Sequence, residues 1–150
     1  MKRAIVAFSF GLRKGGPCDS NIALARAIGK FPKGIMVVAQ REIAALLKSK
    51  PALVIRKHRI QGKYLDSDEV AAQAADFLRK KKISEAIVVA HPFLHIIKCK
   101  QLMQKGGFAV TVPDIGKIPF DKESEQWWSR SAFNFLVYAV LQKLTGRRGH

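Results

Sequence analysis

Short apolar runs alternate with amphipathic stretches along almost the whole chain. The apolar runs are rich in Val, Ile and Ala, which is typical of strands buried on both faces of a parallel sheet. They predict five strands, over residues 4–10, 34–39, 52–55, 86–90 and 108–112. The stretches between them repeat apolar residues at helical spacing, which predicts helices over 21–28 and 40–50, a third behind Asp66 and a fourth between Pro92 and Gly106.

This alternation, with its short connections, predicts one α/β domain over residues 1–150. Its expected fold is a three-layer, Rossmann-like, doubly wound parallel five-stranded sheet with the strand order 3-2-1-4-5. In such sheets, ligands bind outside the carboxyl ends of the strands, where the strand order reverses. Here that point lies between the first and fourth strands. We therefore expect the loop 11–21 and the turn 91–95 to meet there and to form a positively charged cleft.

Two histidines follow the fourth predicted strand. Pro92 ends that strand because proline lacks a backbone N–H, and it suits the first turn of a helix. His95 would lie one turn into this helix, where it could donate a hydrogen bond to an oxyanion or act as a general acid or base. The alternative is a half-buried histidine bonded to a backbone carbonyl. His91 is expected to cap the helix or to pack there, and no third ligand accompanies the pair, so no metal site is predicted.

The last predicted helix, over 123–144, carries apolar residues almost all round. A helix of this kind is usually buried against a sheet or a partner subunit. We therefore expect it to pack on the sheet or to make a homodimer contact. Its Trp127–Trp128 pair is expected in the core or in that contact, with stacking on bases as the alternative.

The chain is strongly basic, with 27 Lys and Arg against 11 Asp and Glu and a net charge of +16. Such a charge favours anionic partners: phosphorylated small molecules, nucleic acid or acidic lipid headgroups. No RNA-recognition signature, helix-turn-helix or zinc knuckle accompanies it. Nucleic acid is therefore the second expectation, and an anionic small molecule is the first.

Cysteine usage bears on the compartment. Cys18 and Cys99 match neither a zinc spacing nor a disulfide framework, and two isolated thiols fit a reducing cytoplasm. The apolar run at 4–10 leads into a basic loop rather than a small-residue cleavage site, so it is interpreted as a strand and not as a signal peptide. No run of about 18 apolar residues predicts a membrane span. The sequence identifies no cofactor.

The loop after the first strand has the chemistry of an anion site. Its glycines and cations are Gly11, Arg13, Lys14, Gly15 and Gly16, with Ser9 before them and Ser20 and Asn21 at the next helix. Glycines let backbone N–H groups approach a phosphate, and a helix N-terminus adds partial positive charge. The loop matches neither dinucleotide nor phosphate-loop fingerprints, so a plain βα loop is the alternative. Cys18, next to that helix N-terminus, is expected to have a lowered pKa.

Asp66 and Ser67 precede the third helix. Asp66 with Glu69 resembles a capping box, which makes a structural role the first interpretation. The functional alternative is that an Asp orients His95 or binds a ribose hydroxyl.

A set of short motifs extends these observations. They are Asp66-Ser67-Asp68, the strand end Val88–His91, His95 with Lys98 three places on, Gly107-Phe108, the tail 135–147 and the first loop with Ser9, Gly11, Gly15 and Gly16. Together they resemble the YdcF/SanA/ElyC-like family of bacterial proteins, a domain of unknown function. The chain is similar to a divergent member, because it has Ser67-Asp68 where the family has Asn-Thr, and Lys98 where the family has Arg. The resemblance implies the Rossmann-like fold more than a reaction.

These observations predict a protein that binds an anionic, phosphate-bearing or nucleotide-like small molecule, with hydrolysis or transfer as the expected chemistry. His95 is the catalytic candidate. The candidate ligand-binding residues are Ser9, Gly11, Arg13, Lys14, Gly15, Gly16, Ser20, Asn21, Asp66, Ser67, His91 and Lys98. The alternative is a basic nucleic-acid-binding or scaffold protein without catalysis.

Overall fold

Five parallel strands form the centre of the computed structural model, which describes residues 2–146. They are β1 (Arg3–Ala7), β2 (Met36–Gln40), β3 (Leu53–Ile55), β4 (Glu85–Val89) and β5 (Ala109–Thr111), in the order β3-β2-β1-β4-β5. All four pairings are parallel, and at the carboxyl edge Ala7 pairs with Ala39 on one side and Val89 on the other. The predicted sheet and its strand order are confirmed.

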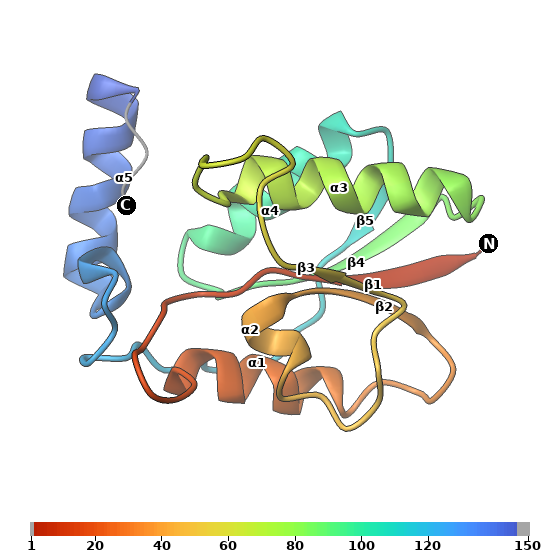
Figure 1. The fold of residues 1–150 in the computed structure, drawn as a ribbon, viewed down its shortest axis with the longest axis horizontal. Coiled ribbons are helices and arrows are strands. Elements are labelled where there is room, and N and C mark those ends of the chain that lie inside the picture. The colour runs from red at the N-terminus through yellow and green to blue at the C-terminus, as the bar shows by residue number, and fades with distance from the viewer. Residues whose placement is uncertain (1, 147–150) are drawn as a thin grey trace.

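Helices cover both faces of this sheet, as Figure 1 shows. They are α1 (Asp19–Ile28) and α2 (Arg41–Ala44) on one face, and α3 (Ser67–Lys80) and α4 (His95–Lys105) on the other. Successive strand residues point to opposite faces, so Ala4 and Val6 pack with α3 and α4, while Ile5 and Ala7 pack with α1 and α2. The result is the expected three-layer α/β arrangement.

The second and fourth helices begin or end at other residues than predicted. The helix expected over 40–50 ends at Ala44, and the chain continues in tight turns in which Leu46 N donates to the Ile43 carbonyl. The fourth helix begins at His95, because Leu94 before it takes a positive φ of 61° that no helix contains. Pro92 therefore lies in a turn before the helix, and the prediction that it occupies the first helical turn is wrong.

The last helix differs most from its prediction. Instead of one helix over 123–144, a 3₁₀ turn, η1 (Trp127–Ser129), is followed by α5 (Ala132–Thr145). Ser131 caps α5 by accepting a hydrogen bond from Asn134 N at 3.1 Å. Within the described part of α5 only Phe135 is buried, whereas Phe133 is 73% exposed and Leu144 is 77% exposed. The helix is thus not packed on the sheet, and a homodimer contact stays a prediction.

The position of α5 matters for the site. It stands across the carboxyl edge of the sheet, beyond the ends of the strands, as Figure 1 shows. Between residues 2 and 146, no helix is both long and apolar enough to cross a membrane. Arg147, the last residue of the family-like tail, lies outside the described residues.

Candidate functional site

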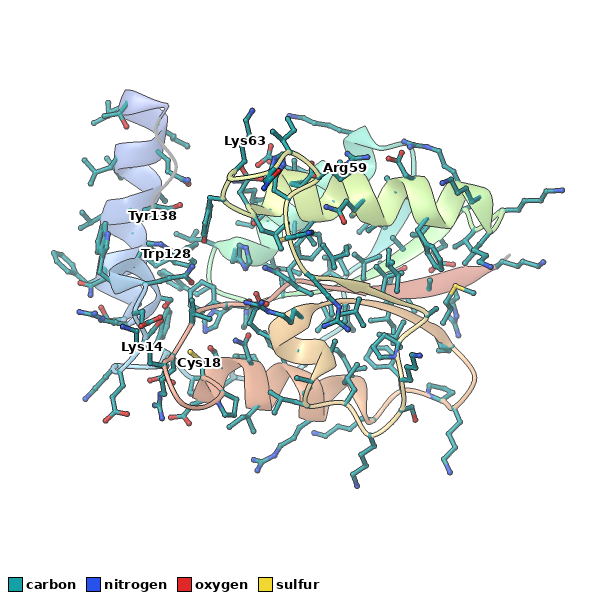
Figure 2. The ribbon with its side chains drawn as sticks, in the orientation of Figure 1. Lys14, Cys18, Arg59, Lys63, Trp128 and Tyr138 are labelled. Atoms are coloured by element: carbon teal, nitrogen blue, oxygen red, sulfur yellow. The ribbon has the colours of Figure 1, made fainter. Side chains whose placement is uncertain are left out.

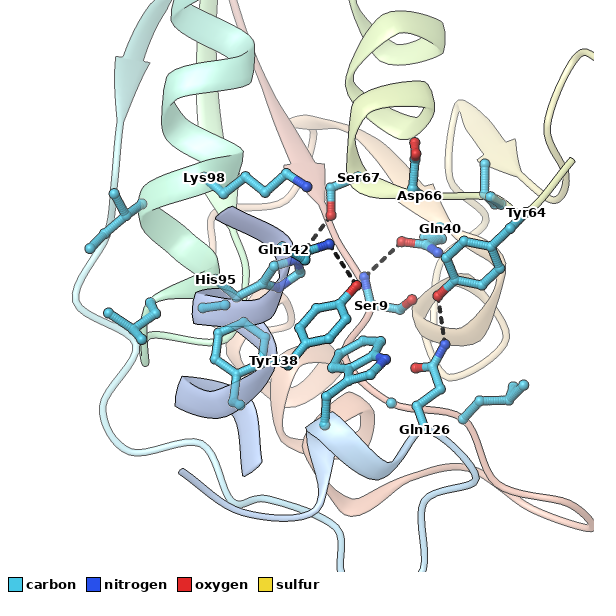
Figure 3. Close-up of a pocket in the computed structure, with 18 of the residues that line it drawn as sticks. Ser9, Gln40, Tyr64, Asp66, Ser67, His95, Lys98, Gln126, Tyr138 and Gln142 are labelled. Carbon is cyan, nitrogen blue, oxygen red and sulfur yellow. Dashed lines mark hydrogen bonds between the residues drawn. The ribbon is translucent and has the colours of Figure 1, made fainter. Parts of the chain in front are cut away.

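A pocket of about 880 Å³ lies at the carboxyl edge of the sheet, between the strand ends and α5. We call it the edge pocket; Figure 3 shows it from close by. Its polar lining includes Ser9, Gln40, Arg41, Arg56, Asp66, Ser67, His95 and Lys98, and its aromatic lining includes Tyr64, Trp128, Phe135 and Tyr138. The edge pocket therefore combines cations, hydrogen-bonding groups and flat apolar rings.

The loop 11–21 and the turn 91–95 meet at this edge as expected, because Gly11 and His95 both line the edge pocket. Phe10, just before the loop, packs against both histidines. The Phe10 ring lies 4.3 Å from the His91 ring and 5.5 Å from the His95 ring, measured between centroids. The edge pocket brings together six of the predicted site residues, namely Ser9, Gly11, Asp66, Ser67, His95 and Lys98. The other predicted residues, Arg13, Lys14, Gly15, Gly16, Ser20, Asn21 and His91, do not line it.

Ser20 and Asn21 hold the first loop in place. The Ser20 hydroxyl donates to the Phe10 carbonyl, and Asn21 Oδ1 accepts from Phe10 N at 2.8 Å. Asn21 Nδ2 also donates to the Gly11 carbonyl at 3.2 Å. Both side chains are buried, so their polar groups serve the loop itself, and their role as ligand contacts stays a prediction.

A carboxylate of the protein occupies the predicted anion position. Asp121 accepts hydrogen bonds from Arg13 Nη2 at 2.7 Å and from Asp19 N, at the start of α1, at 3.0 Å. Hydrogen bonding to Asp121 raises the pKa of Arg13. Lys14 lies 3.7 Å from Glu125, outside the edge pocket, and Figure 2 shows it beside the start of α1. An internal charge thus takes the place that the sequence suggested for a ligand.

The pKa of Cys18 is raised and not lowered, so the expectation from the sequence is wrong. The thiol is buried, with 1% of the residue exposed, and desolvation raises its pKa to about 11. The nearby Asp121 charge acts in the same direction. Burial outweighs the helix N-terminus, so Cys18 is a protonated core residue and not an activated thiol.

His91 packs in the core. Its ring lies between those of Phe10 and Phe120, the latter 4.5 Å away, and its Nδ1 accepts from Phe93 N at 3.2 Å. Burial lowers its pKa to about 4, against the carbonyls of Pro119 and Ile118, which favour the charged form. His91 is therefore neutral at neutral pH and shapes the turn before α4.

His95 is the first residue of α4 and is 7% exposed. Its Nε2 lies 3.1 Å from Ser67 Oγ and 3.5 Å from Cys99 Sγ. Its Nδ1 has no hydrogen-bond partner among the described residues. Burial lowers its pKa to about 3, and the charge of Lys98 adds to this. A side-chain hydroxyl, rather than the backbone carbonyl or Asp considered from the sequence, is the partner of this neutral imidazole.

The N-terminus of α3 forms the neighbouring wall. Asp66 caps the helix by accepting from Glu69 N at 2.9 Å, which confirms its structural role. Lys98 Nζ lies 3.2 Å from an Asp68 carboxylate oxygen, and both side chains are more than a third exposed. A helix N-terminus carries partial positive charge and backbone donors. This wall of the edge pocket therefore combines a helix N-terminus and a lysine with the carboxylates of Asp66 and Asp68.

Two site arginines were not among the predicted residues. Arg41 follows the last residue of β2, and Arg56 follows the last residue of β3. Gln40 Oε1 accepts from Ser9 N at 3.0 Å and joins the ends of β1 and β2. Arg56 directly follows the predicted strand 52–55, so the strand-end rule that pointed to His91 also applies to it. Arg41 lies two residues past the predicted strand 34–39, within the helix predicted over 40–50.

The sequence predicts the Trp127–Trp128 pair in the core or in a homodimer contact, with stacking on bases as the alternative, and gives no placement for Tyr64 or Tyr138. Trp128 and Tyr138 stack with centroids 5.0 Å apart and an angle of 16°, and Figure 2 shows them together near α5. Trp128 is 7% exposed and lines the edge pocket, yet its indole N–H has no partner among residues 2–146. The Tyr64 hydroxyl accepts from Gln126 Nε2 at 2.7 Å, and burial raises the pKa of Tyr64 to about 12. The edge pocket thus offers a flat ring and an available donor.

The loop between β3 and α3 is fixed by one carboxylate. Glu69 accepts from Arg59 Nε at 2.8 Å and from Arg59 N at 3.0 Å. Burial alone raises the pKa of Glu69, but the hydrogen bonds from Arg59 and Gln73 outweigh it and lower the pKa to about 2. The Glu69 side chain therefore serves this loop and not the reciprocal half of the capping box.

We expect Glu69→Gln to lower the free energy of unfolding by about 1–3 kcal/mol near neutral pH. The native pKa lies below the unfolded one, so the Glu69 contribution is present above pH 4.5 and is lost as the pH falls towards 2. Urea denaturation at about pH 6 and about pH 3 should show the difference between wild type and variant shrinking with acid. Asp76→Asn, at the exposed partner of Arg59, is the control and should change little. A difference that is independent of pH would contradict this assignment.

No cluster of three or more His, Cys, Asp or Glu side chains suited to a metal ion occurs in the described part of the chain. The chain matches no protein-family model and no curated protein sequence.

Proposed function

We propose that the chain binds an anionic, phosphate-bearing small molecule of nucleotide type in the edge pocket. One observation carries this: the N-terminus of α3, Lys98, Arg41 and Arg56 line a single pocket at the carboxyl edge of a parallel sheet. This is where ligands bind in open α/β folds. The volume of about 880 Å³ is within the range of small-molecule sites.

The phosphate would lie against α3 and Lys98. Lys98 pairs with Asp68 at 3.2 Å through side chains that are 38% and 36% exposed. An exposed pair of this kind contributes about 1 kcal/mol or less. A phosphate, which carries more charge and accepts the helix N–H donors as well, can therefore replace Asp68 as the partner of Lys98.

The flat part of the ligand would lie against Trp128. A buried donor without a partner costs about 1–3 kcal/mol, and a ligand acceptor at the indole N–H recovers that cost. The aromatic side chains that line the edge pocket add dispersion contacts with a planar group. This contact favours a ligand with an aromatic ring and acceptor atoms over inorganic phosphate alone.

Hydrolysis or transfer on the ligand is part of the proposal, with His95 as the acid–base group. Because burial keeps His95 neutral, it would act first by accepting a proton, and the same burial makes it a weak base. Its position with Lys98 in the edge pocket supports the resemblance to the YdcF/SanA/ElyC-like family, of which we propose the chain to be a divergent member. The free thiols Cys18 and Cys99 support the proposal of a cytoplasmic location.

Isothermal titration of the chain with adenosine monophosphate tests the binding. We expect Lys98→Ala and Arg56→Ala each to weaken the affinity about tenfold, which corresponds to roughly 1.4 kcal/mol. Lys30→Ala removes the same charge next to the end of α1, outside the edge pocket, and should leave the affinity within about twofold. Equal effects of all three variants would show that net charge, and not the edge pocket, binds the ligand.

The second candidate rests on the net charge of +16. A nucleic-acid-binding protein would bind single-stranded DNA or RNA with an affinity that falls steeply with salt. The same three variants distinguish the candidates. Tight, salt-dependent binding of DNA or RNA that is weakened equally by all three, with no binding of adenosine monophosphate, would favour the nucleic-acid function.

A further inference from the structure

A serine hydroxyl and a histidine face each other inside the edge pocket. Ser67 Oγ lies 3.1 Å from His95 Nε2, within hydrogen-bond distance, and Figure 3 shows the two side chains together. Ser67 is the first residue of α3, and His95 is the first residue of α4. Both line the edge pocket. A hydroxyl next to a neutral imidazole is the arrangement of a nucleophile and its base.

We propose that Ser67 is a nucleophile that takes a phosphoryl group from the ligand, with His95 as its base. This inference rests on the proposed function, which puts a phosphate in the edge pocket. A bond forms between Ser67 Oγ and phosphorus while the bond from phosphorus to the leaving oxygen breaks. The hydroxyl proton passes to His95 Nε2 and then to the leaving oxygen. Water next attacks the phosphoserine, loses a proton to His95, and releases inorganic phosphate as Ser67 Oγ regains that proton.

Ser67 is a better candidate for the nucleophile than Cys99 or Ser9. Cys99 Sγ also lies 3.5 Å from His95 Nε2, but Cys99 is 0% exposed and does not line the edge pocket. Burial raises the pKa of the Cys99 thiol, so the thiolate does not form there. Ser9 does line the edge pocket, yet its hydroxyl has no imidazole within hydrogen-bond distance in the described chain.

Two positive groups lie where they can stabilise the negative charge that develops on the phosphoryl oxygens. The N-terminus of α3 begins at Ser67 itself, so its dipole points at any group bonded to Ser67 Oγ. Lys98 lies one helical turn beyond His95 and lines the same wall. Stabilising developing charge is the main protein contribution to phosphoryl transfer.

The base lacks an orienting partner. His95 Nδ1 has no hydrogen bond among the described residues, so no carboxylate fixes the tautomer or stabilises the imidazolium. The ring is instead held by packing, with the Phe10 and Phe135 rings 5.5 Å and 6.2 Å away between centroids. We therefore expect slow turnover, and a reagent that traps the serine is a better probe than a turnover assay.

An alkyl fluorophosphonate is such a reagent, because it transfers a phosphonyl group to a serine oxygen and releases fluoride. We expect one adduct on the full chain, on the tryptic peptide over residues 64–79, in which Ser67 is the only serine. Ser67→Ala should remove the adduct, and His95→Gln should slow labelling by about 10²–10⁴-fold. Ser84→Ala, at an exposed serine by the amino end of β4, is the control and should be labelled at the wild-type rate. Inorganic phosphate should protect Ser67.

The wild-type chain decides the inference by itself, whatever the variants do to folding. Absence of an adduct at Ser67, or an adduct only on other residues, would overturn it. The adenosine monophosphate titration on the same sample keeps the two proposals apart. Binding without labelling would leave the proposed function standing and remove the nucleophile. Labelling of Ser67 without binding would support the reactive serine and remove the nucleotide site.

Discussion

Replacing Phe10 with alanine is expected to lower the free energy of unfolding by about 3–5 kcal/mol. The Phe10 side chain is 0% exposed and joins elements that are far apart in the chain. Its centroid lies 5.5 Å from that of Trp128 and 5.2 Å from that of Phe135, and it also contacts both histidines. Removing the ring leaves a cavity between the sheet edge and α5.

Urea denaturation of the wild type and of Phe10→Ala measures this loss. Phe133→Ala is the matched control, because it removes the same ring from α5 at a position that is 73% exposed. Its expected effect is within about 0.5 kcal/mol. A loss below about 1 kcal/mol for Phe10→Ala would mean that the lining residues Trp128, Phe135 and His95 are not packed against Phe10 as described. Because His91 and His95 pack against the Phe10 ring, ligand binding should weaken in the same variant.

The sheet could be predicted because its signals are local. Runs such as Ala86–Ala90 bury β-branched residues on both faces, and each ends at a residue that cannot continue the strand or starts a loop. Parallel strands joined by short connections then leave few possible orders. The strand order and the edge that carries the site followed from these patterns, although several ends moved by a few residues.

The first half of the predicted helix 123–144 shows what a local pattern misses. Ser124 Oγ accepts from Leu12 N at 3.1 Å and donates to the Leu12 carbonyl at 3.0 Å, and Ser129 Oγ donates to Ser124 Oγ at 2.7 Å. The two bonds to Leu12 join residues 112 positions apart, and together with the Ser129 bond they hold the segment as a loop and a 3₁₀ turn. Helical periodicity gives no information about such contacts.

The site was predicted in its location and only partly in its chemistry. The spacing of His95 and Lys98 after the fourth strand identified two wall residues. The protonation of His95 could not be predicted, because it depends on burial beneath Phe10 and Phe135, which come from other parts of the chain. For the same reason the Ser67 contact was not among the expected partners of His95. Residues from distant parts of the chain determine the pKa of His95, whereas the local sequence determines where His95 lies.

Asp121 is the clearest case of a distant partner, and Asp121→Ala is expected to lower the free energy of unfolding by about 2–3 kcal/mol. The side chain is 1% exposed and accepts from Arg13 Nη2 at 2.7 Å, Asp19 N at 3.0 Å and Glu123 N at 2.9 Å. The variant loses all three bonds at once. Arg13, which is 28% exposed, can regain water, and this keeps the loss below that of a fully buried pair. Thermal or urea unfolding measures the change.

Lowering the pH should remove part of the same free energy of unfolding from the wild-type protein. Burial alone raises the pKa of Asp121, but the hydrogen bond from Arg13 outweighs it, so the native pKa lies below the usual value of 3.8. Stability from the Asp121 charge is therefore present above about pH 4 and disappears as the pH falls through the native pKa. Asp121→Asn keeps the shape and removes the charge, so wild type and variant should converge in stability below that pH. If the two curves stay parallel from neutral pH into acid, the Arg13 contact is not what holds the first loop, and the loop would be open to the anion that the sequence suggested.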